Sequence, residues 1–163
     1  MGLFDTIFGS KREKKVESGS TNKGIRYKSD LIDMLEEDHQ SLFGLYGDMI
    51  SGCDANEYDL VLSKLKEFKT ELGMHIYIEN IQLYTYIKNY FESEADQLVF
   101  IEQVQEEMDG IVKAVVDFAE SWNATGIDKE NISTFKEQLE GIGAVLTKRT
   151  KMEETRLYTL YQS

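Results

Sequence analysis

The sequence predicts an all-α protein, an up-down-up-down four-helix bundle that follows a flexible N-terminal tail. The chain has no proline in 163 residues, whereas average usage of about 5% would give roughly eight. This absence favours long, uninterrupted helices. Apolar residues recur at helical spacing in four stretches, and strand-type alternation is nowhere sustained. Four amphipathic helices joined by short connections bury their apolar faces most simply as a bundle.

The first two helices are expected in the first half of the chain. The first covers about 29–51, with Ser29 as a candidate N-cap and Gly52 as the signal that ends it. The second covers about 56–91, where an apolar pattern runs from Leu62 to Tyr90. These two segments predict one antiparallel helix pair.

The other two helices follow with the same kind of spacing. Ser93 starts a sequence that resembles a capping box, and apolar residues then repeat in steps of three and four from Ile101 to Trp122. The stretch NATGID interrupts this pattern, and Asp128 is a candidate cap for a fourth helix whose apolar residues run from Phe135 to Leu160. The body of the protein is therefore expected to span residues 29–163.

The net charge of −12 is unevenly distributed along the chain. Residues 1–28 contain seven Lys/Arg and three Asp/Glu, a net charge of +4, so residues 29–163 carry −16. A body this acidic repels phosphates, and we expect no direct binding to nucleic acid. Residues 10–27 are rich in Ser, Gly and charged side chains, which predicts a flexible linker.

The segment MGLFDTIFG at the N-terminus leaves several interpretations open. Leu3, Phe4, Ile7 and Phe8 would share one side of a short helix, and the segment matches the myristoylation pattern that starts at Gly2. Three interpretations are open. The segment is a disordered start or docks on the protein itself, it forms a helix that binds a membrane surface or a partner, or it is a lipidated anchor. Membrane contact, if any, is expected only through this tail.

Composition also limits the chemistry and the compartment. A single cysteine excludes a disulfide framework and multi-cysteine zinc sites, so metal chemistry must use the two histidines, His39 and His75. No run of residues is long and apolar enough for a membrane span, and no signal-peptide pattern is present. We therefore expect a cytoplasmic protein.

A few polar residues lie on the apolar stripes of the expected helices. His39 lies on the stripe of the first helix, and His75 and Glu79 lie one turn apart on the second. Arg149 and Glu153 have the same four-residue spacing on the fourth helix, so both point the same way. Imidazoles and carboxylates that face one another across a bundle are the arrangement by which carboxylate-bridged iron sites are held.

Four motifs resemble the hemerythrin and HHE cation-binding family over roughly residues 29–161. LIDMLEEDHQSLFGLY is similar to its first helix, HIYIENIQLYTYI to its H-x-x-x-E helix, EEMDGIV to its third and RTKMEETRLYTL to its fourth. In both the second and fourth motifs, a Leu-Tyr pair follows the glutamate by four and five residues: Leu83–Tyr84 and Leu157–Tyr158. The resemblance implies a hemerythrin-like bundle with metal ligands at these positions: His39, His75, Glu79 and Glu153.

This chain departs from the family pattern at two ligand positions and two prolines. Met108 and Arg149 stand where the family has histidines, and Thr85 and Thr159 replace prolines that follow the Leu-Tyr pairs. A diiron centre of the family type uses more than two histidines. We therefore expect a degenerate site, and we expect the second and fourth helices to continue past the two threonines.

Three interpretations of these polar residues remain open. In the first, Arg149 replaces the metal by bridging Glu79 and Glu153 in a buried layer with His39 and His75, and no cofactor is bound. In the second, the four histidines and glutamates form a reduced metal site, with iron as the cofactor. In the third, they are ordinary solvent-facing residues.

The functional expectation follows from the first two interpretations. The favoured one is a non-catalytic signalling or regulatory module that binds a protein partner, because nothing in the sequence indicates a catalytic site. A weak similarity to anti-sigma regulators of the regulator-of-sigma-D type suggests a basic or helical partner, such as a sigma factor. The alternative is a non-haem iron protein that senses or carries iron, O2 or NO. The sequence indicates no oligomeric state.

Overall fold

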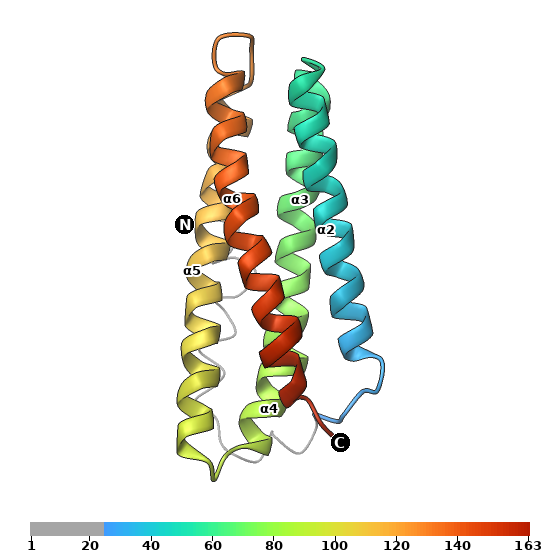
Figure 1. Cartoon of the computed structure of the whole chain (residues 1–163), viewed down its shortest axis with the longest axis vertical. Helices are drawn as coiled ribbons and strands as arrows, with labels where there is room; N and C mark the ends of the chain where they lie inside the picture. The colour runs from blue at the N-terminus through green and yellow to red at the C-terminus, as the bar shows by residue number, and fades with distance from the viewer. Residues whose placement is uncertain (1–24) are drawn as a thin grey trace.

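A computed structural model of the chain describes residues 25–163, and these form the expected bundle of four long helices (Figure 1). The long helices, in chain order, are α2 (Leu31–Asp54), α3 (Tyr58–Ile78), α5 (Ala95–Thr125) and α6 (Ile132–Met152). They run alternately up and down, with α2 and α3 side by side and α6 crossing in front of α5 in this view. The expectations for MGLFDTIFG and for most of the linker lie outside the described residues.

The second and fourth helices both continue beyond their α-helical part. The chain passes from α3 into a π-helical segment, η4 (Glu79–Tyr84), and then into α4 (Thr85–Tyr90). It passes from α6 into a second π-helical segment, η5 (Glu153–Leu157), and ends in a 3₁₀ turn, η6 (Tyr158–Leu160). Helical structure thus extends through Thr85 and Thr159, as the missing prolines predicted.

The helix ends differ in detail from those that the sequence suggested. Gly52 does not end the first helix; α2 continues to Asp54, and the chain turns at Asn56, which has a φ of 57°. Gly52 is buried, and a Cβ at this position would lie only 2.7 Å from a methyl group of Val61 in α3. The glycine therefore permits close packing of α2 on α3 rather than ending the helix.

The N-terminal caps were only partly predicted. The caps of α2 and α5 are Asp30 and Glu94, each one residue after the serine expected there, and neither side chain makes a capping hydrogen bond. The cap of α6 is Asn131 and not Asp128, but Asp128 organises the turn before this helix, because its carboxylate accepts hydrogen bonds from the backbone N–H groups of Glu130 and Asn131. These differences of one to three residues do not change the packing of the bundle.

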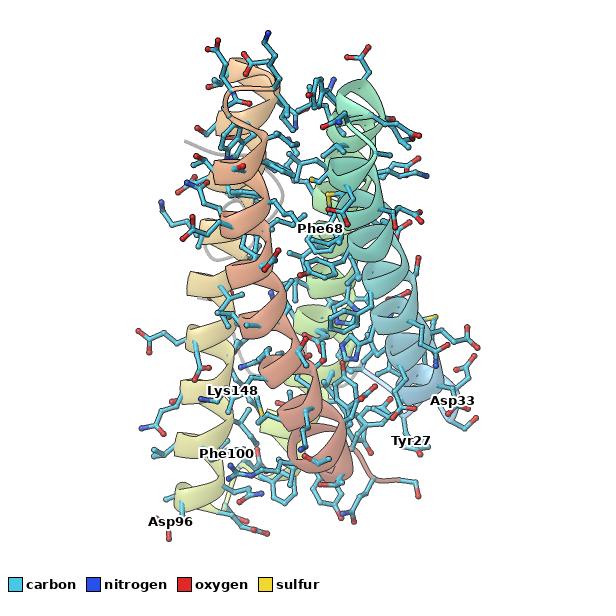
Figure 2. All side chains as sticks on the ribbon, turned by 45° about the horizontal axis from the view of Figure 1, so that its top comes forward. Tyr27, Asp33, Phe68, Asp96, Phe100 and Lys148 are labelled. Atoms are coloured by element: carbon cyan, nitrogen blue, oxygen red, sulfur yellow. The ribbon has the colours of Figure 1, made fainter. Side chains whose placement is uncertain are left out.

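The interior of the bundle consists of two apolar clusters. One lies toward the α5–α6 connection and includes Phe68, which Figure 2 shows between the helices. The other lies at the opposite end, where Leu83 and Leu157 pack against Leu35. No helix within residues 25–163 is both long enough and apolar enough to cross a membrane.

The chain just before α2 is held against the second apolar cluster. The Tyr27 ring stacks on that of Tyr161, with 4.7 Å between ring centroids, and the Lys28 backbone N–H donates a hydrogen bond to the Tyr161 hydroxyl over 2.7 Å. The packed body therefore includes residues 27 and 28, slightly before the boundary expected at residue 29.

Substituting Gly52 by alanine tests the close approach of α2 and α3. Gly52→Ala should lower the free energy of unfolding by about 1–3 kcal/mol, because the new methyl group overlaps the buried Val61 side chain. Gly47→Ala in the same helix is the matched control, since a Cβ there meets nothing within 4 Å. It should stabilise the protein by about 0.5–1 kcal/mol. Urea unfolding monitored by circular dichroism measures both, and equal effects would contradict the packing.

Candidate metal centre

A layer of charged side chains separates the two apolar clusters. Its members are the five residues that the sequence singled out, and each is at most 3% exposed: His39, His75, Glu79, Arg149 and Glu153. They are also the only fully buried charged or imidazole side chains within the part of the chain that the structure describes. The interpretation that they are solvent-facing is therefore wrong. Buried charges are costly unless each one is paired, so this layer needs a specific explanation.

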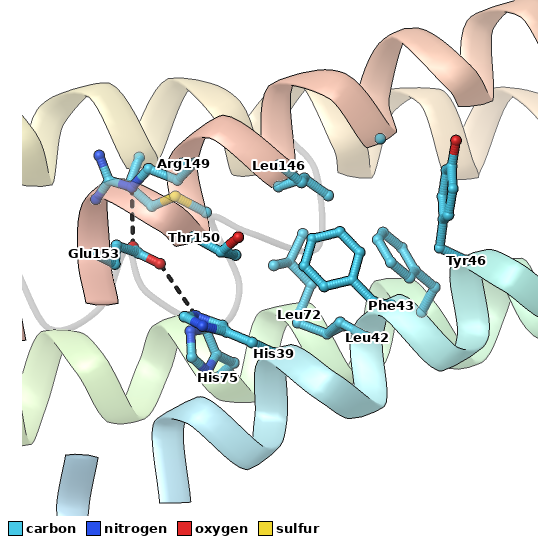
Figure 3. A pocket seen from close by; sticks show the side chains of 13 residues that line it. His39, Leu42, Phe43, Tyr46, Leu72, His75, Leu146, Arg149, Thr150 and Glu153 are labelled. Atoms are coloured by element: carbon cyan, nitrogen blue, oxygen red, sulfur yellow. Dashed lines mark hydrogen bonds and ion pairs between the residues drawn. The ribbon is translucent and has the colours of Figure 1, made fainter. Parts of the chain in front are cut away.

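Four of the five residues offer metal-ligating atoms that converge on one point. The donor atoms of His39, His75, Glu79 and Glu153 all lie within 4.8 Å of one another. His39 Nε2 lies 3.2 Å from Glu153 Oε1, and His75 Nε2 lies 3.5 Å from Glu79 Oε2 (Figure 3 shows the first pair). They come from α2, from α3 with η4, and from η5, so three parts of the chain build the cluster.

Each imidazole is held from its outer side by a second carboxylate. His75 Nδ1 lies 3.1 Å from Asp38 Oδ2, and His39 Nδ1 lies 3.3 Å from Glu154 Oε1. Both carboxylates are partly exposed. Metal-binding histidines usually donate their second ring N–H to such a partner, which fixes the ring and directs the other nitrogen at the ion. Here that arrangement directs both Nε2 atoms into the buried layer.

Arg149 occupies the side of the layer next to α5. Its Nε donates to Glu153 Oε2 over 2.9 Å, and its Nη1 donates to the Val104 carbonyl over 3.0 Å. Its Nη2 donates to the Tyr84 hydroxyl, also over 3.0 Å. The expectation that Arg149 bridges both carboxylates is therefore wrong: it pairs with Glu153, and the remaining donors reach other groups.

Glu79 is paired with a tyrosine instead. The Tyr158 hydroxyl donates a hydrogen bond to Glu79 Oε2 over 2.6 Å and lies 3.2 Å from His39 Nε2. Burial raises the pKa of this phenol, and the nearby Glu79 and Glu153 raise it further, so Tyr158 is a neutral donor in this arrangement. The two Leu-Tyr pairs of the sequence thus supply the hydroxyl groups on the two sides of the layer.

The charges within the layer balance one another. Burial opposes the charged form of His75, but Glu79 and the hydrogen bond to Asp38 outweigh it and raise the pKa of His75 to about 10. Burial likewise opposes ionisation of Glu79, yet His75, Tyr158 and Arg149 together hold its pKa below the ordinary value. Two carboxylates thus face two cations, protonated His75 and Arg149.

Hydrogen bonding in the layer is nevertheless incomplete. Three buried side-chain atoms in the described residues have no hydrogen-bond partner, and two of them, His75 Nε2 and Glu79 Oε1, belong to this cluster. The 3.5 Å between His75 Nε2 and Glu79 Oε2 suits an ion pair but is long for a hydrogen bond. Buried donors and acceptors without a hydrogen-bond partner are rare in proteins, and a bound ion or an ordered water molecule is one explanation for them.

A small cavity of about 20 Å³ adjoins the cluster (Figure 3). His39, His75, Arg149 and Glu153 are among the residues that line it, and Met108 is one of the apolar residues that enclose it. Its volume is enough for one molecule of about the size of water. Met108, which replaces a family histidine, therefore forms part of a cavity wall.

Two residues of the layer are poor ligands for a metal ion. Arg149 places a permanent cation on the α5 side, and Met108 offers only a weakly ligating thioether. One ligand atom each from two imidazoles and two carboxylates does converge within reach of a single ion, and His75 and Glu79, which have side-chain atoms without a hydrogen-bond partner, are among these residues. The residues present thus suit one ion.

The fold and the donor set define a four-helix bundle with a buried histidine and glutamate cluster at its centre. The family model described as Hemerythrin HHE cation binding domain matches residues 30–161, and the chain belongs to this family. No curated protein and no solved structure matches the chain. The family match covers all four long helices and confirms the fold class that the motifs implied.

Four residues of the site were not identified as functional from the sequence. Asp38 contacts His75 on the next helix, and Glu154 contacts His39, which is 115 residues away in the chain. Contacts between different helices cannot be inferred from the spacing of residues within one helix. Tyr84 and Tyr158 were noted only as members of repeated Leu-Tyr pairs. The repetition of this pair after each glutamate is the only feature of the sequence that indicates that both tyrosines contact the buried layer.

The buried pair of Arg149 and Glu153 should be expensive to break. Arg149→Met in metal-free protein should lower the free energy of unfolding by about 3–5 kcal/mol, because Glu153 loses its main buried counter-charge. Lys113→Ala, which removes an exposed ion pair with Asp117, is the control and should leave stability close to that of the wild type. Urea unfolding measures both; a small loss for Arg149→Met would contradict a buried, charged layer.

The raised pKa of His75 predicts a pH-dependent stability in metal-free protein. Its folded-state pKa of about 10 exceeds the ordinary 6.5, so protonation stabilises the fold fully below pH 6.5, and this stabilisation is lost as the pH rises toward 10. The free energy of unfolding should therefore decline across that interval, and less so in His75→Asn. NMR of the imidazole resonances reports the pKa directly, and titration of His75 near pH 6.5 would refute the assignment.

Proposed function

We propose that this protein is a hemerythrin-like iron protein with one metal position instead of two. His39, His75, Glu79 and Glu153 bind the ion, and Arg149 takes the place of a second one. The observation that carries this proposal is the convergence of the four donors, with His75 Nε2 and Glu79 Oε1 buried and without a hydrogen-bond partner. A ligand between these atoms would satisfy both of them.

The donor set supports iron as the metal. Imidazole and carboxylate ligands without thiolate are typical of non-haem iron sites, and iron is the metal that the hemerythrin resemblance implies. The carboxylates of Asp38 and Glu154 would keep both imidazoles in the orientation that binding requires. When bound, iron supplies a redox-active centre, and the adjoining cavity has room for one molecule of about the size of water. The proposed role is sensing or carrying iron, O2 or NO, without catalysis.

Iron content is the direct test of this site. Protein loaded with ferrous iron without oxygen should retain one iron per chain after desalting, and His75→Ala or Glu79→Gln should abolish retention because each removes a ligand. Asp38→Asn should weaken binding by about 10–100-fold, because it loosens the ring of His75 without removing a ligand. Glu102→Gln, an exposed carboxylate on α5, is the control. Wild-type protein that retains no iron would refute the proposal.

A second candidate function is a metal-free module that binds a protein. The charge balance of the layer supports it, because protonated His75 and Arg149 neutralise Glu79 and Glu153 without any ion. The charge of −16 on residues 29–163 would attract a basic, helical partner and strengthen binding at low salt. This candidate is supported if protein from iron-replete cells is metal-free and retains a basic protein that high salt releases.

A further inference from the structure

The hydroxyl group of Tyr158 lies among the four donor atoms of the cluster. It is 2.6 Å from Glu79 Oε2 and 3.2 Å from His39 Nε2, and the side chain is 3% exposed. Its ring also stacks on the imidazole of His39, with 5.7 Å between the ring centroids. Tyr158 is therefore held in place by two of the proposed ligands, which come from different helices.

These distances are those expected between atoms that share one metal ion. Nitrogen and oxygen ligands bind at about 2.0–2.2 Å, so two neighbouring ligands of one ion lie about 3 Å apart. The Tyr158 oxygen has this spacing to Glu79 and to His39, as His39 Nε2 has to Glu153 Oε1. Tyr158 is not among the residues that line the adjoining cavity.

Tyr84 offers an internal comparison. Tyr84 follows Glu79 by five residues, as Tyr158 follows Glu153, and it is also buried. Its hydroxyl, however, accepts a hydrogen bond from Arg149 Nη2 on the α5 side of the layer. Tyr84 thus contacts the guanidinium, whereas Tyr158 contacts the atoms that could bind a metal ion.

We propose that Tyr158 is a fifth ligand when the bound iron is ferric, an inference that rests on the proposed iron site. On binding, a bond forms between the phenol oxygen and Fe³⁺, the O–H bond breaks, and the proton leaves to water. No electron is transferred in this exchange of ligands. A bound cation favours deprotonation of a group that coordinates it, and a phenolate is a hard anionic ligand that suits Fe³⁺ better than Fe²⁺.

The experiment loads wild-type protein, Tyr158→Phe and Tyr84→Phe with ferric citrate, removes excess iron, and measures bound iron and the visible spectrum of each. A phenolate bound to Fe³⁺ gives an intense visible charge-transfer band and tyrosine ring modes in the resonance Raman spectrum. Wild-type protein and Tyr84→Phe should show both signatures. Tyr158→Phe should lose them while its circular dichroism spectrum remains that of the wild type.

The outcomes separate this inference from the iron site itself. Wild-type protein that binds iron without the band would overturn the role of Tyr158 and leave the four-residue site intact. Persistence of the band in Tyr158→Phe, or its loss in Tyr84→Phe alone, would also overturn it. Absence of bound iron from wild-type protein, with either ferrous or ferric loading, would overturn the proposed function as well.

Discussion

The burial of two carboxylates in the middle of the bundle is the constraint on which the rest of this structure depends. Glu79 and Glu153 lie between two apolar clusters and are almost completely removed from water. An unpaired buried carboxylate costs several kcal/mol, so the fold must supply compensating charge. Arg149 and His75 supply it from within the layer, and Tyr158 donates to Glu79. The identity of each polar residue therefore follows from this one requirement.

The backbone has the same feature in the second and the fourth long helix of the bundle. Both buried glutamates are the first residues of π-helical segments, η4 and η5, and each segment leads to a Leu-Tyr pair. A π-helical turn changes the direction of the following side chains, and such turns are frequent at functional sites. Here the turns place Leu83 and Leu157 in the second apolar cluster and bring the two tyrosines to the layer. The two tyrosines then differ in their contacts: the Tyr84 hydroxyl contacts the guanidinium of Arg149, and the Tyr158 hydroxyl contacts Glu79 and His39.

Much of the fold followed from the sequence because helical spacing of apolar residues determines which faces are buried. The same spacing placed His75 with Glu79, and Arg149 with Glu153, one turn apart on inward faces. Contacts between distant segments did not follow in this way. The pairing of Arg149 with Val104 and Tyr84 depends on the rotation of α6 against α5 and on the π-helical turn after Glu79. Gly52 was interpreted as a helix end because the neighbouring Val61, which requires the glycine, lies on another helix.

In the proposed site, one metal ion and one guanidinium share the space that two ions would need. Anomalous diffraction at the iron edge, from crystals of protein loaded with iron, locates the bound metal directly. We expect one anomalous peak among His39, His75, Glu79 and Glu153, with Arg149 still bound to Glu153. Two peaks, or a single peak in the position of the Arg149 side chain, would contradict this expectation, and so would iron-loaded crystals with no peak in the layer.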